Sequence, residues 1–149
     1  MKPATLRLVL LVSCAHMLVH VYELSISSVE QHVADEFGVA TRETGSLGTI
    51  WRIPFGAGAL LAGWLADRFG SKPMLVLYLC GCAGSALATW AAPSLGALFA
   101  TMFAMGSFAS IYHPAGLAII SRETTAADDR AVRLRPPAVE RRLDELRRR

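Results

Sequence analysis

The sequence predicts an all-α membrane protein, and this fold class rests on the composition and on where the charges lie. Of the 149 residues, 53% are hydrophobic and 18% are charged, and the mean hydropathy is +0.39. About a quarter of the residues of an average soluble domain are charged. Residues 122–149 hold nine Arg and six acidic residues, so the first 121 residues contain only 12 of the 27 charged side chains. A soluble fold would spread its charges over every helix, so the sequence favours a membrane protein.

Four apolar segments have the length of about 20 residues that crosses the hydrocarbon core of a membrane. They cover about residues 6–26, 46–66, 73–92 and 95–120. We therefore expect four transmembrane helices in a domain of residues 1–121, followed by a basic tail of residues 122–149. Pro73 fits the first turn of the third helix, where its missing N–H is not needed. Phe37-Gly38 is expected to end a helical extension of the first span.

The charges of the connecting segments predict the orientation of the chain. Lys2 and Arg7 precede the first span, the first loop carries four acidic residues against one Arg, and residues 67–73 are net basic. Because Lys and Arg gather on the cytoplasmic side, both termini and the 67–73 loop are expected in the cytoplasm, with the spans in a cell (inner) membrane. Leu11-Val-Ser-Cys14 resembles a lipoprotein cleavage site, but the apolar run continues past Cys14, which favours an uncleaved helix over a signal peptide.

Three ionisable residues of the first span share one face of the predicted helix. His16, His20 and Glu23 are spaced i, i+4, i+7. Because ionisable groups at membrane depth usually face a bundle interior or a water-filled path, these residues are candidates for a substrate or proton pathway. The alternative places His20 and Glu23 near the outer membrane surface, hydrated and without such a role, and makes His16 a structural hydrogen-bonding group.

Arg52 is the most informative single residue, because it lies about six positions into the second span. An Arg there costs several kcal/mol unless it finds a partner or water. Small residues recur on its face at a spacing that lets helices approach closely: Gly45, Gly48, Gly56, Ala59 and Gly63. We expect Arg52 to point into protein or a cavity, with Glu23 as its counter-charge or an anionic substrate as its bidentate ligand. A structural Arg that reaches outward to the membrane surface is the alternative.

The fourth span is expected to contain a kink. Pro114 removes a backbone hydrogen bond from the helix, and Ser110 or His113 can satisfy the carbonyl groups that this frees. His113 therefore joins the candidates for the substrate or proton pathway.

The segment Gly63-Trp-Leu-Ala-Asp-Arg-Phe-Gly-Ser-Lys-Pro73 links two apolar segments through a very short polar turn. It resembles the loop between the second and third helices of the major facilitator superfamily, whose members carry Gly-x-x-x-Asp-Arg/Lys-x-Gly-Arg/Lys there. Ser71 stands where the family usually has a second basic residue. The resemblance implies the first four helices of a twelve-helix transporter fold. It also implies a gating loop that latches the outward-facing state, made of Gly63, Asp67, Arg68, Gly70 and Lys72. A turn that only sets topology is the alternative.

The fourth span extends this resemblance. Gly106, Pro114 and Arg122 match the family's Gly-rich stretch, Pro and short run to the cytoplasmic end, and Tyr-His-Pro-Ala-Gly around Pro114 resembles the fosmidomycin-resistance-type efflux branch. Met102 and Phe103 occupy the region where many members carry an Arg that pairs with the gating loop.

The resemblance implies secondary active transport of a small molecule, anionic or drug-like, in a proton-linked process. A fifth span should follow Thr125, but a charged segment follows instead. We therefore expect the N-terminal part of a transporter whose reading frame was lost near residues 125–130, with the second half as its missing partner. The alternatives are a complete four-span oligomeric exporter with Glu23 as proton-linked carboxylate, or a membrane scaffold without transport activity.

Other function classes find no support in the sequence. It shows no nucleophile or nucleotide motif, and Cys14, Cys80 and Cys82 lie in apolar runs without the convergent ligands that zinc needs. We expect no enzyme, no metal and no cofactor. The basic excess of +3 is small and follows from membrane insertion. The expected partners are therefore the lipid bilayer and a small molecule, and not nucleic acid.

Overall fold

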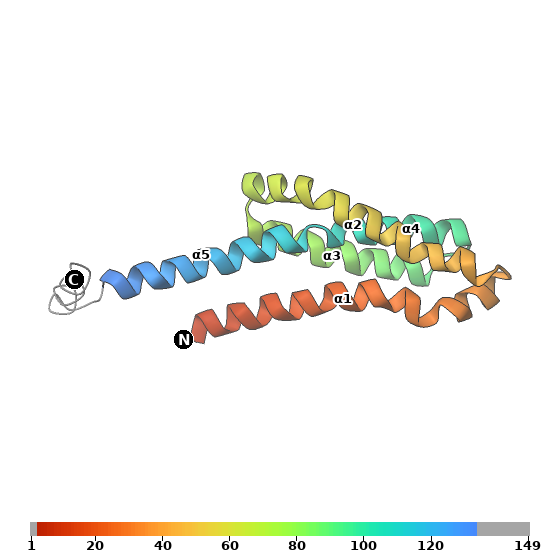
Figure 1. Cartoon of the computed structure of the whole chain (residues 1–149), viewed down its shortest axis with the longest axis horizontal. Helices are drawn as coiled ribbons and strands as arrows, with labels where there is room; N and C mark the ends of the chain where they lie inside the picture. Colours follow the sequence, from red (N-terminus) through yellow and green to blue (C-terminus); the bar gives the residue numbers. More distant parts are fainter. Residues whose placement is uncertain (1–2, 134–149) are drawn as a thin grey trace, which may run out of the picture. The chain divides into compact units, whose positions relative to one another are not determined.

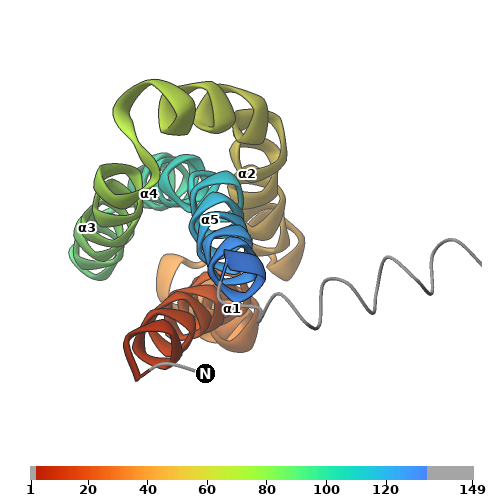
Figure 2. The ribbon, with the colours of Figure 1, turned by 90° about the vertical axis from the view of Figure 1, so that its left-hand side faces the viewer.

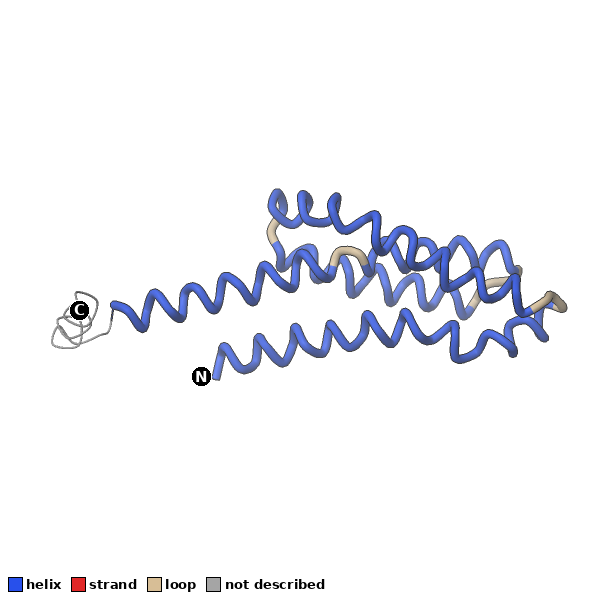
Figure 3. Tube along the Cα trace, in the orientation of Figure 1, coloured by secondary structure: helices blue, strands red, loops and turns tan. Residues whose placement is uncertain are grey.

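The computed structural model of the chain describes residues 3–133, and within that range it consists of helices joined by short turns, without a strand (Figures 1 and 3). The helices are α1 (Pro3–Phe37), α2 (Thr41–Phe69), α3 (Ser71–Trp90), α4 (Leu95–Ala109) and α5 (Tyr112–Arg133). The described residues divide into two units, residues 3–119 and residues 120–133. The all-α prediction is confirmed for the described residues.

Two glycines with positive φ end the first two helices. Gly38 has φ of +63° and follows the last residue of α1, which ends at Phe37 as the sequence predicts. Gly70 has φ of +91° and turns the chain directly from α2 into α3, with Pro73 in the first turn of α3. Because side chains other than glycine rarely adopt such φ values, these positions set where the chain reverses.

The first four helices run alternately up and down (Figure 1). The turn at Gly70 lies at the same end of the bundle as the start of α1, and the turns at residues 38–40 and 91–94 lie at the opposite end (Figure 3). At that opposite end the Ser94 hydroxyl accepts a hydrogen bond from the Ala97 N–H over 3.2 Å and caps α4.

Helix α4 lies between α2 and α3 and contacts both, while α1 packs mainly on α2 (Figure 2). Apart from Thr44, the largest fully buried side chains are apolar or aromatic and come from four helices: Val12 and Val19 of α1, Leu47 and Trp51 of α2, Tyr78 and Cys82 of α3, and Met102 of α4. Burial of these apolar groups supplies the contacts that fix α2 between α1 and α4.

Three helical stretches are long and apolar enough to cross a membrane, by length and composition: Thr5–Phe37, Ser71–Trp90 and Leu95–Glu123. Helix α2 is not among them, because glycines and Arg52 dilute its apolar residues. The prediction of four transmembrane helices therefore stays a prediction at α2, which has the length of a span but a lower apolar content.

The fourth predicted span is interrupted just before its proline. Helix α4 ends at Ala109 and α5 begins at Tyr112, so Pro114 falls in the first turn of α5. The Ser110 hydroxyl donates to the Ser107 carbonyl over 2.7 Å, whereas the carbonyl that the missing N–H of Pro114 leaves free is that of Ser110, so the predicted role of Ser110 or His113 at that carbonyl stays a prediction. Of the predicted tail, residues 122–133 belong to α5, while residues 134–149 lie outside the described residues.

Candidate functional site

Two buried tyrosines hold helix α1 in place. The Tyr112 hydroxyl donates to the Val12 carbonyl over 2.8 Å, and the Tyr78 hydroxyl donates to the Ala15 carbonyl over 2.8 Å. Both acceptors lie within four residues of His16, on α1 itself. Each bond satisfies a hydroxyl that is otherwise costly to bury, so the tyrosines determine where the ionisable face of α1 lies.

A glycine sets the position of the neighbouring helix α2. A Cβ atom at Gly106 of α4 would collide with the backbone carbonyl oxygen of Trp51 and would lie 3.0 Å from Cγ of Pro54. Only glycine therefore allows α4 to approach α2 this closely. Because Trp51 directly precedes Arg52, this contact also fixes the height of Arg52 along the bundle.

The ionisable residues of α1 and Arg52 of α2 form one connected chain of contacts. Arg52 Nε lies 3.3 Å from Glu23 Oε1, and the other carboxylate oxygen, Oε2, lies 3.3 Å from His20 Nδ1. His20 Nε2 in turn lies 3.1 Å from His16 Nε2. The predicted pairing of Arg52 with Glu23 is thus confirmed, and the chain runs over four side chains from two helices.

The chemistry of the groups assigns the protons along this chain. A carboxylate only accepts hydrogen bonds, so the contact with Glu23 requires a proton on Nδ1 of His20. At Nε2 of His20 the direction of the bond depends on the tautomers, because either His16 Nε2 or His20 Nε2 can carry the proton of that contact. The three side chains are thus joined by two hydrogen bonds, from His16 through His20 to Glu23.

His113 reaches the same place from α5 through ring contacts rather than hydrogen bonds. Its ring centroid lies 5.5 Å from that of His16, 5.4 Å from that of Tyr112 and 5.6 Å from that of Phe55. Phe55 stacks on Trp51 at a centroid distance of 4.7 Å. Aromatic faces therefore border the chain of polar groups on the α2 and α5 sides.

The small-residue face of α2 is open on both sides of Arg52, although it approaches α1 at its start, where a Cβ atom at Gly45 would lie 2.9 Å from Oε1 of Glu30. A Cβ atom at Gly48 or Gly56 would meet nothing within 4 Å, and the Arg52 side chain is 56% exposed. The close helix contacts instead fall on Gly106, as described above, and on Gly58, whose Cβ would lie 2.6 Å from the Ser110 hydroxyl oxygen. Arg52 therefore contacts Glu23 but otherwise faces open space within residues 3–133.

The charged residues of the predicted gating loop form no ion pair with one another in the described part of the chain. The Asp67 carboxylate forms no ion pair with any residue that the structure describes. The Arg68 guanidinium lies over aromatic rings, 5.7 Å from the centroid of Trp64 and 5.9 Å from that of Phe69. Gly63 approaches Pro114, which its Cβ would meet at 3.9 Å. Lys72 is exposed near the start of α3.

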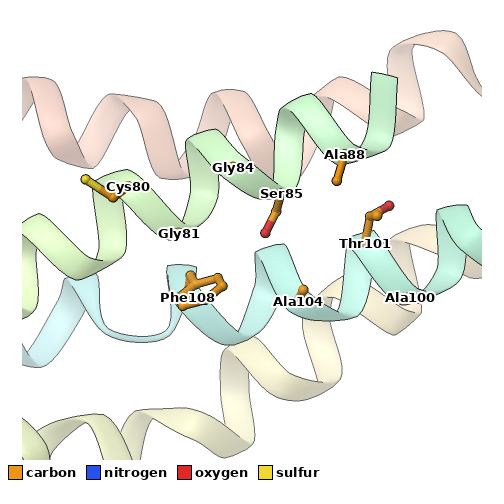
Figure 4. A pocket seen from close by; sticks show the side chains of 9 residues that line it. All are labelled: Cys80, Gly81, Gly84, Ser85, Ala88, Ala100, Thr101, Ala104 and Phe108. Atoms are coloured by element: carbon orange, nitrogen blue, oxygen red, sulfur yellow. The ribbon is translucent and has the colours of Figure 1, made fainter. Parts of the chain in front are cut away.

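A groove between α3 and α4 is chemically unlike the polar chain (Figure 4). It has a volume of about 440 Å³ and is lined by small or apolar residues: Cys80, Gly81, Gly84, Ser85, Ala88, Ala100, Thr101, Ala104 and Phe108. None of these residues is charged, so the groove offers no group that would recognise a charged substrate. In residues 3–133 no group of three or more His, Cys, Asp or Glu is placed to hold a metal ion.

The structure brings the five candidates predicted from the sequence into one connected region: His16, His20, Glu23, Arg52 and His113. The tyrosines that position α1 and the aromatic pair on α2 were not predicted: Tyr78, Tyr112, Trp51 and Phe55. Buried tyrosines in an apolar run could have signalled this, because each hydroxyl requires a partner inside the bundle.

Comparison with known proteins places these observations in a family. The family model described as Major Facilitator Superfamily matches residues 10–133. A probable sulfoacetate transporter, SauU, of Cupriavidus necator is 28% identical over 74 residues, which are 49% of this chain and 17% of that protein. The puromycin resistance protein pur8 of Streptomyces alboniger is 34% identical over 82 residues, which are 55% of this chain and 16% of that protein. The aligned part thus spans about one sixth of each relative, and no solved structure matches.

Proposed function

The protein belongs to the Major Facilitator Superfamily. We propose that it forms the part of a proton-linked transporter that contains the connected side chains of Arg52, Glu23, His20 and His16. Membership and the apolar helices make it a multi-pass membrane protein concerned with transport of a small molecule. The single observation that carries the finer proposal is the contact chain from Arg52 through Glu23 and His20 to His16. Four connected ionisable groups on transmembrane segments are costly unless they serve a substrate or ion.

We propose an arrangement of the helices in the membrane with four spans and two cytoplasmic termini. α2 crosses the membrane as the second of four spans, which correspond to the first part of a twelve-helix fold. Both termini and the loop at residues 67–73 lie in the cytoplasm, and the membrane is the inner membrane of a cell. The open face of α2 at Gly48, Arg52 and Gly56 is where a second half of the transporter, or a second copy of the chain, completes the substrate site.

We propose that the gating loop latches the outward-facing state of the transporter. Asp67 forms no ion pair among the described residues, which leaves it available to contact a second half. Arg68 lies over the rings of Trp64 and Phe69, a placement that suits a membrane surface. The gating set of Gly63, Asp67, Arg68, Gly70 and Lys72 stays a prediction, as does the likeness to the fosmidomycin-resistance-type efflux branch.

The substrate class follows from the relatives only in outline. One relative is described as a probable sulfoacetate transporter and the other as a puromycin resistance protein. Sulfoacetate is an anion and puromycin is a drug, so we propose an anionic or drug-like small molecule as substrate. Efflux is the direction that the second relative suggests.

The test measures binding and transport separately with the 149-residue chain. The chain is purified in detergent for binding of sulfoacetate and puromycin, and it is reconstituted into liposomes that contain a pH-sensitive dye. As part of a larger transporter, it should bind one of the two compounds but move no protons when a gradient of that compound is applied. The bound compound should lose affinity when Arg52 is replaced by Gln.

Other outcomes decide against this proposal. Proton movement driven by either compound with the chain alone, and lost in the Glu23→Gln variant, would establish the complete oligomeric exporter instead. Absence of both binding and transport would leave a membrane scaffold as the better description. Glu30→Gln is the matched control, because Glu30 lies on α1 two turns from Glu23 and in no ion pair with a described residue.

A further inference from the structure

Two histidines of α1 face each other with the same ring nitrogen. Nε2 of His16 lies 3.1 Å from Nε2 of His20, and the ring centroids lie 4.9 Å apart with an angle of 66° between the ring planes. Both residues are exposed in the described part of the chain. Two histidines spaced i, i+4 on one helix face can bind the same metal ion, as they do in the zinc helices of metalloproteases.

We propose that His16 and His20 form a two-nitrogen site for a divalent transition-metal ion of the class that prefers imidazole, such as Ni²⁺ or Zn²⁺. The site goes beyond the proposed function, because it requires neither transport nor a second half. Water supplies the remaining ligands, since in residues 3–133 no group of three or more His, Cys, Asp or Glu is placed to hold an ion. The expectation that the protein binds no metal considered only its cysteines. With only two protein ligands the ion binds reversibly and is not a permanent part of the fold.

The distance between the two nitrogens fits a shared ion. At a metal–nitrogen distance of about 2.05 Å, nitrogens 3.1 Å apart subtend an angle of about 98° at the metal. This angle lies between the values of about 90° and about 109° for octahedral and tetrahedral coordination.

The distance between the two rings agrees with the same geometry. An imidazole centroid lies about 1.15 Å behind its nitrogen, so two rings that point at one ion should have centroids about 4.8 Å apart. The observed distance is 4.9 Å. A straight N–H···N bond in line with both rings would instead separate the centroids by about 5.4 Å. The rings of His16 and His20 are therefore already inclined toward a common point.

Glu23 is placed to orient one of the two ligands. Its Oε2 lies 3.3 Å from Nδ1 of His20, and because a carboxylate only accepts, this nitrogen carries the proton. In the neutral imidazole the free lone pair is then on Nε2, which faces His16. Metal-binding histidines almost always donate their other ring N–H to a carboxylate, carbonyl or water in this way. Glu23 is thus a positioning residue that acts on the ion through His20.

The charges around the pair require a site in contact with water. The Glu23 carboxylate offsets part of the charge of a dication, but its other oxygen lies 3.3 Å from Arg52 Nε. A dication removed from water at membrane depth would be costly. The side chain of His20 is 52% exposed and that of Arg52 is 56% exposed, so the ion can keep its water ligands on the open face. His113 borders the site from α5, with its ring centroid 5.5 Å from that of His16.

Calorimetry with the 149-residue chain tests the site, with Ni²⁺ as probe. The chain is purified in detergent without a histidine tag, and we expect it to bind one Ni²⁺ ion. Loss of an outer-shell partner weakens metal binding about tenfold or more, so Glu23→Gln should bind about tenfold more weakly. His20→Ala removes a ligand and should weaken binding by at least the same factor. X-ray absorption of the bound Ni²⁺ should show two imidazole ligands, and this measurement needs no variant.

Matched variants separate metal binding at the pair from binding elsewhere. His32→Ala removes another exposed histidine of α1, and Cys14→Ser removes an exposed thiol close to His16 in sequence. Both should leave the affinity for Ni²⁺ unchanged. Mg²⁺ should not bind, because it prefers oxygen ligands. Circular dichroism of His20→Ala should show the helix content of the unchanged chain.

Arg52→Gln separates the metal site from the proposed substrate site. This variant removes a positive charge near the pair, so it should bind Ni²⁺ at least as tightly as the unchanged chain. The same substitution should weaken binding of the transported compound, as stated above.

Four results would overturn the metal site. They are no binding of Ni²⁺ to the unchanged chain, binding that a folded His20→Ala variant does not weaken, binding that Cys14→Ser abolishes, and a bound ion with fewer than two imidazole ligands. None of these results bears on the proposed function, which is tested with sulfoacetate and puromycin.

Discussion

The two faces of helix α2 make opposite use of small residues. On the face toward α4, Trp51 and Ala62 are 1% and 2% exposed, and the backbone of Trp51 touches Gly106. On the other face, Gly56 meets nothing within 4 Å and Arg52 is 56% exposed. A glycine therefore permits close helix packing where a neighbouring helix is present. Where no helix packs against it, a glycine leaves open space beside the charged side chain.

The largest difference between the two faces should appear when one methyl group is added to each. Gly106→Ala places Cβ against the Trp51 carbonyl, which is backbone and cannot rotate away, so the free energy of unfolding should fall by about 2 kcal/mol. Gly56→Ala meets no atom and should change it by less than about 1 kcal/mol. Denaturant unfolding of both variants in mild detergent measures the difference.

The gain in helix propensity from Gly to Ala is shared by both variants, so it cancels in their comparison. Equal stabilities of Gly106→Ala and Gly56→Ala would contradict the close contact between α2 and α4. Gly96→Ala, on an exposed position of α4 with nothing within 4 Å, is the control for α4 itself.

An intermediate effect is expected where the packed core holds α1. Tyr78→Phe removes the hydroxyl that donates to the Ala15 carbonyl over 2.8 Å, and it should lower the free energy of unfolding by about 1 kcal/mol. Tyr22→Phe should have almost no effect, because the Tyr22 hydroxyl has no hydrogen-bond partner among the described residues. Thermal unfolding followed by circular dichroism compares the two. A larger loss for Tyr22→Phe would mean that α1 is not held through Tyr78.

The smallest effect on stability is expected on the open face. A double-mutant cycle of Glu23→Gln and Arg52→Gln should give a coupling energy of about 0.5 kcal/mol, because exposed ion pairs contribute little. The Arg52 substitution should have its main effect on binding of sulfoacetate or puromycin. Chemical unfolding of the four proteins measures the coupling, and a value above about 3 kcal/mol would show that the pair is a buried structural element rather than an accessible site.

The part of the site that depends only on the spacing of residues along one helix was predictable from the sequence. His16, His20 and Glu23 share a helix face through their i, i+4, i+7 spacing, and Glu23 was the natural counter-charge for Arg52. The arrangement of the charges in the turn was not predictable: Asp67 forms no ion pair with a described residue, and Arg68 lies over Trp64 and Phe69. Charges next to one another in a tight turn have many solvated arrangements of similar energy, and spacing does not select among them.

The sequence by itself determined the membrane class, the family and the residues of the polar chain, because apolar length, motif and helical spacing are local properties. Only the tertiary structure decided which face of α2 is packed. The glycine pattern around Arg52 predicted close packing on that face of α2. The close helix contacts lie on the other face instead, at Gly58 of α2 and where Gly106 of α4 meets Trp51. A helix has small residues on more than one side. The shape of the neighbouring helix determines which of these sides packs against it, and here Gly106 of α4 fits against the Trp51 carbonyl of α2.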